Sequence, residues 1–552
     1  MPLSPNDILN LDIRSNTFEP ILNSEISSDE LNVNSDWENK LKLNIKKNIT
    51  ILNFILVKLV EKMKNLIKFP YKFILISMVA SATFGCYEDL DDNGAFTNEI
   101  NDFVWKGMNA AYLYKDNIDD LSNNRFTNDS DYIDYLNLYE TPEVLFENLI
   151  FNRETIDKHS VIVDDYVELQ QYFQGVSTSN GMEYGLRYIP GSNFNIYGYV
   201  RYVHPGSVAD ENNIQRGDIF FEINNNSLNL DNYSSLLSMD NYTVNFADYI
   251  NNNTPEINDD TIVNNNVTVD LYKVSLEKNP IFHFDIIENS EGRSGYLLYN
   301  QFTSTFDDEL NEVFANFKSN NIDNLILDLR YNSGGSVNSA RLISTLITGQ
   351  FTNEIFSTEQ WNNEIQNYWL NNDPEYLINR FIDNPNSLNL NSVIIITSRS
   401  SASASELVIN CLKPYIDVIQ VGTTTYGKYQ ASVTLYDSPD FSLNGVNPSH
   451  NYALQPLVLK TLNSMGETDY YNGLSPNIIA DEDSSNLGII GNPDEPLLSI
   501  ALEQISSDKN LNNYTELLDL IGDSSEFDLL SNEMYYLIEN YSKFVNIYER
   551  KK

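Results

Sequence analysis

The 552-residue sequence has little cysteine, histidine or positive charge, and each shortage argues against a class of protein. Two cysteines cannot build a disulfide framework or a cysteine-based zinc site. The four histidines are scattered without a His-Glu-x-x-His spacing, so we expect neither a metal nor another cofactor. The formal net charge of −44 argues against nucleic acid as a ligand, because its phosphates would be repelled. The acidic residues are spread along the chain, which is typical of solvated surface.

A serine-rich turn follows the short β-branched run 393–396, which predicts a buried strand. The chain then passes through small residues into a helix-like stretch at 407–412. A serine at a helix N-terminus meets free N–H groups and the positive end of the helix dipole, which suits a nucleophile whose product is an oxyanion. A second strand-like run, 417–421, leads to Lys428, so we expect this lysine on a neighbouring loop. A plain serine-rich turn followed by a surface lysine is the alternative.

The motif Ser-Ala-Ser-Ala-Ser-Glu at 401–406, followed by a Gly-Lys pair, resembles the carboxyl-terminal processing peptidases, also called tail-specific proteases. The resemblance implies that Ser403 is the nucleophile and that Lys428 is the general base. Their separation, 428 − 403 = 25, agrees with the spacing in that family. The family often carries a glutamine four residues after the lysine. Ser432 stands there in this chain and Gln430 lies two residues earlier, so either could position the amine.

A Gly-Gly turn ends another strand-like run, at 325–330. The turn contains Gly334 and Gly335, and Ser336 is suited to N-cap the helix that follows. A phosphate-binding loop has a similar outline, but its Gly-Lys-Ser/Thr ending is absent from this turn. In the processing peptidases such a turn lies beside the nucleophile. The resemblance therefore implies an oxyanion hole made by the backbone N–H of Gly334 or Gly335 and that of Ala404.

Residues 184–224 resemble a PDZ domain of the protease-associated kind, through Tyr-Gly-Leu-Arg-Tyr at 184–188, a Pro-Gly-Ser turn and an Arg-Gly-Asp-Ile strand entry. Such domains bind a peptide by strand addition and hold its terminal carboxylate in a nest of backbone N–H groups. The peptide-binding loop implied here consists of Tyr184, Gly185, Leu186 and Arg187. Arg187 stands where a second glycine is common, and an arginine can itself pair with a carboxylate. A PDZ fold that only braces the protease is the alternative.

The N-terminal region has the features of a lipoprotein signal. Met63 opens a lysine-containing stretch, which precedes the apolar run 73–84, Cys86 and an acidic tether. This order predicts that Cys86 is the lipidated first residue of the mature chain and that residues 1–62 are an extension of the gene model or disordered. The apolar run is too short for a transmembrane helix. We expect a protein in the cell envelope of a Gram-negative bacterium, lipid-anchored in the outer membrane on its periplasmic face or at the cell surface; an uncleaved anchor with a free thiol is the alternative.

The resemblance covers residues 96–480 and implies a multidomain α+β protein. Its expected parts are a helical cap, a PDZ-like β-rich domain, an α/β protease core of the processing-peptidase, crotonase-like ββα type, and a C-terminal helical segment. The predicted boundaries are 1–62 for the extension, 63–86 for the signal peptide, 87–95 for the tether, 96–175 for the cap, 176–276 for the PDZ-like domain, 277–482 for the core and 483–552 for the C-terminal helical segment.

These features predict a serine endopeptidase that cleaves proteins or peptides recognised by their free C-termini. Lys428 can be a base only when neutral, so its pKa must fall by about 3 units from ~10.4, which burial can achieve. A Ser-His-Asp enzyme is the nearest chemical rival, but no Gly-x-Ser-x-Gly motif occurs in the chain. The rival from another class is a non-catalytic PDZ-containing lipoprotein that binds peptides or another ligand on a degenerate protease fold. The oligomeric state is left open.

Overall fold

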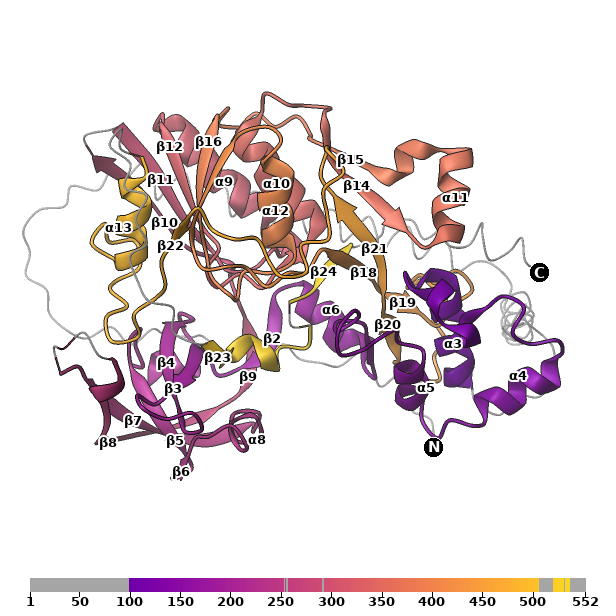
Figure 1. Cartoon of the computed structure of the whole chain (residues 1–552), viewed down its shortest axis with the longest axis horizontal. Coiled ribbons are helices and arrows are strands. Elements are labelled where there is room, and N and C mark those ends of the chain that lie inside the picture. The colour runs from indigo at the N-terminus through magenta and orange to yellow at the C-terminus, as the bar shows by residue number, and fades with distance from the viewer. Residues whose placement is uncertain are drawn as a thin grey trace, which may run out of the picture. The chain divides into compact units, whose positions relative to one another are not determined.

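The computed structural model describes residues 99–252, 254, 257–289, 292–505, 520–530 and 532–536 (Figure 1). Cys86, the predicted signal peptide and residues 1–62 lie outside the described residues. Within the described ranges, no helix is long and apolar enough to cross a membrane. The same ranges contain no group of His, Cys, Asp or Glu side chains that could hold a metal ion.

The N-terminal region is helical, as predicted. Its α-helices are α3 (Glu99–Ala111), α4 (Asp129–Leu136), α5 (Pro142–Asn148) and α6 (Tyr166–Phe173). Asn128, Thr141 and Asp165 cap the last three, each accepting a backbone N–H in the first turn. Phe103 and Met108 of α3 are buried in one hydrophobic cluster with residues of the protease core. The helical region is therefore packed onto the core.

A β-rich region follows the helices and forms a sheet of order β23-β3-β4-β5-β7-β8. Its strands are β3 (Met182–Tyr188), β4 (Ile196–Val203), β5 (Ile219–Ile223), β7 (Asn241–Ile250) and β8 (Thr261–Tyr272), with the short β6 (Asn226–Ser227) beside β5. A separate pair, β2 (Val176–Ser179) and β9 (Val274–Glu277), joins the region to its neighbours in the chain. The short helices are α7 (Val208–Glu211) and α8 (Tyr233–Leu237). Leu186, Val200 and Phe220 form part of its buried core.

The predicted peptide-binding loop at 184–188 is wrong as a loop, because these residues lie inside strand β3. Tyr184 and Leu186 point into the core, and alternation of side chains along a strand explains their burial. Both edges of β3 are paired, one with β4 and the other with β23 (Leu520–Asp523). Gly181, immediately before the strand, has a positive φ of +85°.

The predicted core at 277–482 contains a sheet of order β10-β11-β12-β16-β17-β22. Its strands are β10 (Ile281–Asn289), β11 (Gly292–Tyr299), β12 (Asn324–Asp328), β16 (Ser392–Thr397), β17 (Asp417–Gly422) and β22 (Ile478–Ile479), and from β11 onward they pair in parallel. The helices that pack on it are α9 (Asp307–Ser319), α10 (Val337–Thr348), α12 (Ala404–Leu412) and α13 (Pro496–Glu503). Ile395 packs in the cluster of α9, α10 and α12, whereas Ile394 and Ile396 pack in that of α13. Burial on both faces explains the continuous β-branched run.

A second sheet of order β13-β24-β18-β21-β14-β15 lies beside the ends of α10 and α12. Its strands are β13 (Gly335–Ser336), β14 (Ile355–Trp361), β15 (Ile378–Arg380), β18 (Gln430–Val433), β21 (Leu457–Leu462) and β24 (Met534–Tyr536). A three-stranded sheet consists of β1 (Val161–Val163), β19 (Leu435–Tyr436) and β20 (Ala453–Gln455). The prediction of a helical C-terminal segment holds for α13 but is wrong for 520–523 and 534–536, which are strands. Their hydrogen-bond partners are distant in sequence, so local periodicity does not reveal them.

Candidate active site

Ser403 lies in the turn that joins β16 to α12, as predicted, and it is the residue before the helix. Its φ of +65° and ψ of −112° are unfavourable for a non-glycine residue. Ser405 N donates to Ala402 O at 3.0 Å and Ala402 N donates to Asn332 O at 3.1 Å, so the surrounding backbone holds the turn in this conformation. Strain of this kind gathers at functional sites. The Ser403 side chain is 0% exposed, and its Oγ has no hydrogen-bond partner among the described residues.

Glu406, the last residue of the serine motif, joins the Ser403 turn to the loop of Lys428. Its carboxylate accepts the backbone N–H groups of Ser403 at 2.8 Å, Gly427 at 2.7 Å and Lys428 at 2.8 Å. It also accepts the hydroxyl of Thr425 at 2.5 Å. Burial raises the pKa of Glu406 to about 7, although its four donors favour the charged form. The sequence alone predicts no role for Glu406, although its place within the serine motif is a signal that it belongs to the site.

Lys428 is 1% exposed and forms an ion pair with Glu533 through its Nζ. Burial lowers the pKa of Lys428, while the Glu533 carboxylate opposes that shift. Burial also raises the pKa of Glu533, against the effect of the lysine. The direction at Lys428 agrees with the lowering that base catalysis requires. The partner, Glu533, was not foreseen from the sequence.

The Gly-Gly turn lies against the serine. Gly334 and Gly335 have φ of +118° and +126°, and a Cβ on Gly334 would lie 2.6 Å from Cβ of Ser403. Glycine is therefore required for this close approach. Gly334 N donates to the side chain of Asn332 at 2.9 Å, and Gly335 N donates to the carbonyl oxygen of Glu533 at 2.8 Å. Ala404, the third predicted donor, is the first residue of α12.

The two residues predicted to position the lysine have other direct partners in the structure. Ser432 Oγ donates to the Glu533 carboxylate, so Ser432 contacts the partner of Lys428. Gln430 Nε2 donates to the hydroxyl of Tyr114 at 3.1 Å. The pairing of β18 with β21 is irregular between Ala431 and Ser432. This irregularity explains why the side chains of Gln430 and Ser432 point in different directions. Neither has a hydrogen bond to Lys428 within the described part of the chain.

The Asp-Leu-Arg motif before the Gly-Gly turn serves a buried ion network. Arg330 is 2% exposed and contacts Asp328 at 2.7 Å, Glu495 at 2.7 Å and Glu482 at 3.3 Å. The backbone oxygen of Arg330 accepts the hydroxyl of Ser398, at the start of the serine-rich turn. The network therefore fixes the Gly-Gly turn and the serine-rich turn relative to each other.

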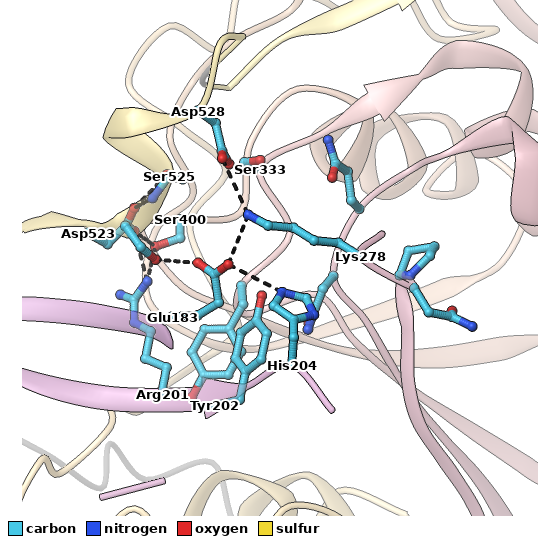
Figure 2. A pocket seen from close by; sticks show the side chains of 16 residues that line it. Glu183, Arg201, Tyr202, His204, Lys278, Ser333, Ser400, Asp523, Ser525 and Asp528 are labelled. Atoms are coloured by element: carbon cyan, nitrogen blue, oxygen red, sulfur yellow. Dashed lines mark hydrogen bonds and ion pairs between the residues drawn. The ribbon is translucent and has the colours of Figure 1, made fainter. Parts of the chain in front are cut away.

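A polar pocket lies between β3, β4, the core and the chain at 523–528 (Figure 2). Arg201 Nη1 contacts Asp523 at 2.8 Å, and Lys278 Nζ lies 3.0 Å from Glu183 and 3.5 Å from Asp528. Arg187, the predicted carboxylate ligand, does not line this pocket. Its guanidinium instead donates to Glu482 O at 2.7 Å and pairs with Asp481 at 3.1 Å.

Comparison with known proteins agrees with the serine motif. Residues 293–445 match the family described as Peptidase family S41, and residues 99–161 match the Peptidase S41 N-terminal domain. These matches support a serine peptidase, and over both ranges the chain is similar to peptidase family S41.

Solved structures add a likeness in fold. A Bacteroides fragilis protein described as an S41 protease is 24% identical, with a TM-score of 0.56 over 73% of this chain and 96% of that one. The photosystem II D1 C-terminal processing protease is 16% identical, with a TM-score of 0.44 over 75% of this chain and 99% of that one. Mature CPAF is 12% identical, with a TM-score of 0.38 over 76% of this chain and 99% of that one. No curated protein matches the chain.

Proposed function

We propose that the protein is a serine endopeptidase in which Ser403 is the nucleophile and Lys428 is the general base. The observation that carries the proposal is the hydrogen bonding of Glu406, which holds the backbones of both residues through one buried carboxylate. The strained turn presents the serine, and burial favours the neutral amine on the lysine. The crotonase-like classification of the core stays a prediction.

In the proposed reaction, neutral Lys428 takes the proton of Ser403 while the serine oxygen attacks a peptide carbonyl. Backbone N–H groups of Ala404 and of Gly334 or Gly335 stabilise the oxyanion that forms. Lys428 then returns the proton to the leaving amine, and water hydrolyses the acyl-enzyme to regenerate the serine. Burial lowers the pKa of Lys428, which is the direction that a lysine base requires.

Substrate recognition through C-terminal tails is the second part of the proposal. The edge of β3 that β23 occupies could hold an extended peptide by strand addition once β23 has left it. Arg201 and Lys278 line the polar pocket beside this edge, and their cationic groups suit a carboxylate. We further propose that Cys86 carries a lipid anchor and places the enzyme in the cell envelope.

A non-catalytic peptide-binding protein is the second candidate function. The complete burial of Ser403 favours it, since a nucleophile must meet its substrate. A fluorophosphonate probe separates the two candidates, because only an activated serine is covalently modified. We expect the label on Ser403 by peptide mass spectrometry, and complete loss of label and of protein hydrolysis in Ser403→Ala.

Ser405→Ala is the matched control. Ser405 lies one step further along the Ser-Ala repeat, and its hydroxyl donates to Asn332 O at 3.0 Å. The control should keep the label. If Ser405→Ala loses the label while Ser403→Ala keeps it, the nucleophile is misassigned. No label on any serine after long incubation would favour the binding protein.

A further inference from the structure

One stretch of chain spans both the β3 edge and the Ser403 site. We call residues 520–530 and 532–536 the C-terminal segment. Its first strand, β23, pairs antiparallel with β3, with Leu520 opposite Arg187 and Asp523 opposite Gly185. Its second strand, β24, pairs in parallel with β13 and with β18. Figure 1 shows both strands in yellow, far in sequence from the elements they join.

At the β3 edge, the C-terminal segment is bound as an added strand. Ile521 and Phe527 pack against the core of the β-rich region. Tyr184 N donates to Ser524 Oγ at 3.2 Å, and Ser524 Oγ donates to Glu183 at 2.5 Å. The chain's own residues therefore use the backbone and apolar contacts that an added peptide strand would use.

The polar pocket of Figure 2 holds the acidic side chains of this segment. Arg201 faces Asp523, and Lys278 lies between Asp528 and Glu183. Ser400, three residues before the nucleophile, also donates to Asp523. Removing one partner of a buried ion pair is strongly destabilising, because the other charge is left buried without compensation. A peptide carboxylate that enters this pocket must therefore replace Asp523 or Asp528.

At the active site, the same segment reaches both the predicted oxyanion donors and the base. The carbonyl oxygen of Glu533 accepts the N–H of Gly335 at 2.8 Å, and the Glu533 carboxylate pairs with Lys428. The Glu533 carboxylate favours the ammonium form of Lys428, which cannot take a proton, and so opposes the neutral amine that burial favours. Ser403 is 0% and Lys428 is 1% exposed, so a substrate can reach the dyad only after some neighbouring chain moves. The C-terminal segment contacts both Lys428 and the Gly-Gly turn through Glu533.

We propose that the C-terminal segment is an intramolecular pseudosubstrate that keeps the Ser403 site closed, and that it is displaced by a peptide whose carboxylate replaces Asp523 at Arg201. The inference rests on the proposed peptidase function. Glu533 could instead be a positioning residue for Lys428. The hydrogen bond from Gly335 N to the backbone carbonyl of Glu533 favours a pseudosubstrate. A residue that only orients the lysine amine does not need to occupy an oxyanion donor.

The test uses the full chain and the variant Glu533→Gln, with Glu526→Gln as the matched control. Glu526 is an exposed glutamate of the same segment, and its carboxylate accepts the hydroxyl of Tyr233 at 3.4 Å. Ser403 labelling by a fluorophosphonate and hydrolysis of unfolded casein are measured beside backbone hydrogen exchange of the C-terminal segment. We expect Glu533→Gln to raise both rates by about tenfold and to speed exchange, since it removes the carboxylate from a buried ion pair. Glu526→Gln should match the wild type.

A pH series separates the two roles of Glu533. Removing the carboxylate that opposes the lowering of the Lys428 pKa should move the acidic limb of kcat/KM to lower pH. Loss of activity in Glu533→Gln, with the control unchanged, would overturn the inference and make Glu533 a positioning residue. Equal labelling of all three proteins, or fast exchange of the segment in the wild type, would also overturn it. Absence of label even where exchange shows the segment released would refute the peptidase assignment, and the inference with it.

Discussion

The Ser403 site and the polar pocket of Figure 2 contain the same kind of contact, a buried cation facing a carboxylate of the C-terminal segment. The two cations differ in chemistry. Burial lowers the pKa of Lys428, whereas at Arg201 the surrounding Tyr199 and Asp523 outweigh burial and hold the pKa well above its ordinary value. An arginine stays charged and can only bind, while a lysine can lose its proton and act as a base. In the proposed enzyme, the lysine therefore serves as the base and the arginine as the group that binds a carboxylate.

Replacing Lys428 by arginine makes the two cations alike, and of the changes considered it should have the largest effect on activity. Lys428→Arg keeps the positive charge but cannot accept the proton of Ser403. We expect kcat/KM for a peptide substrate to fall by about 10³-fold, the scale of general base catalysis. Lys460→Arg is the control, because Lys460 forms a more exposed pair with Asp469 and should tolerate the change. An active Lys428→Arg enzyme would show that Lys428 is not the base.

The buried carboxylates of the two regions also differ, and this difference predicts opposite effects of pH on stability. The pKa of Glu406 is raised by burial from 4.5 to about 7, whereas Arg201 lowers the pKa of Asp523 despite burial. A carboxyl group whose pKa is raised in the folded state adds stability at pH values below its pKa in the unfolded chain. For Glu406, that stability is lost as the pH rises from 4.5 to about 7. A lowered pKa adds stability above the unfolded value, and that stability is lost as pH falls.

Glu406→Gln isolates the first effect. The amide should destabilise the fold by about 1–3 kcal/mol, because its NH₂ group meets backbone donors. Between acid and mildly alkaline pH, however, the free energy of unfolding of the variant should rise by about 3 kcal/mol relative to that of the wild type, because residue 406 no longer titrates. Urea unfolding at about pH 4.5 and about pH 8 measures this change. Glu375→Gln, at an exposed glutamate, should show no comparable gain, and an equal gain there would assign the effect to general charge repulsion.

The serine turn and the Gly-Gly turn could be predicted because each is encoded locally. A β-branched strand, small residues and a helix start place Ser403, and the close approach of Gly334 to it requires glycine. Glu533 could not be predicted, since it lies 105 positions from Lys428 and its contact depends on how β24 inserts between β13 and β18. Residues 184–187, predicted to form a peptide-binding loop, lie in a strand instead, and the pairing of both β3 edges is a tertiary feature that the local sequence does not reveal.

The smallest expected effect concerns which arginine recognises a substrate carboxylate. A peptide that the enzyme cleaves can be compared with its C-terminal amide, which lacks one charge. We expect the amide to raise KM by about tenfold with a smaller change in kcat, because the carboxylate binds away from the scissile bond. Arg201→Met should bring the acid-to-amide ratio of KM close to one.

Arg187→Met tests the residue that the sequence favoured, and the ratio within each variant cancels any general loss of stability. Arg187 already pairs with Asp481 and donates to Glu482, so its loss should lower stability but leave the preference for the acid. If Arg187→Met removes the preference and Arg201→Met keeps it, the carboxylate binds beside β3 at Arg187, and the pocket of Figure 2 only clamps the C-terminal segment. If the wild type cleaves acid and amide equally well, the β-rich region braces the protease and specificity lies in the groove at Ser403. High salt should leave the Arg201 preference nearly intact, because a buried ion pair is screened far less than surface charges.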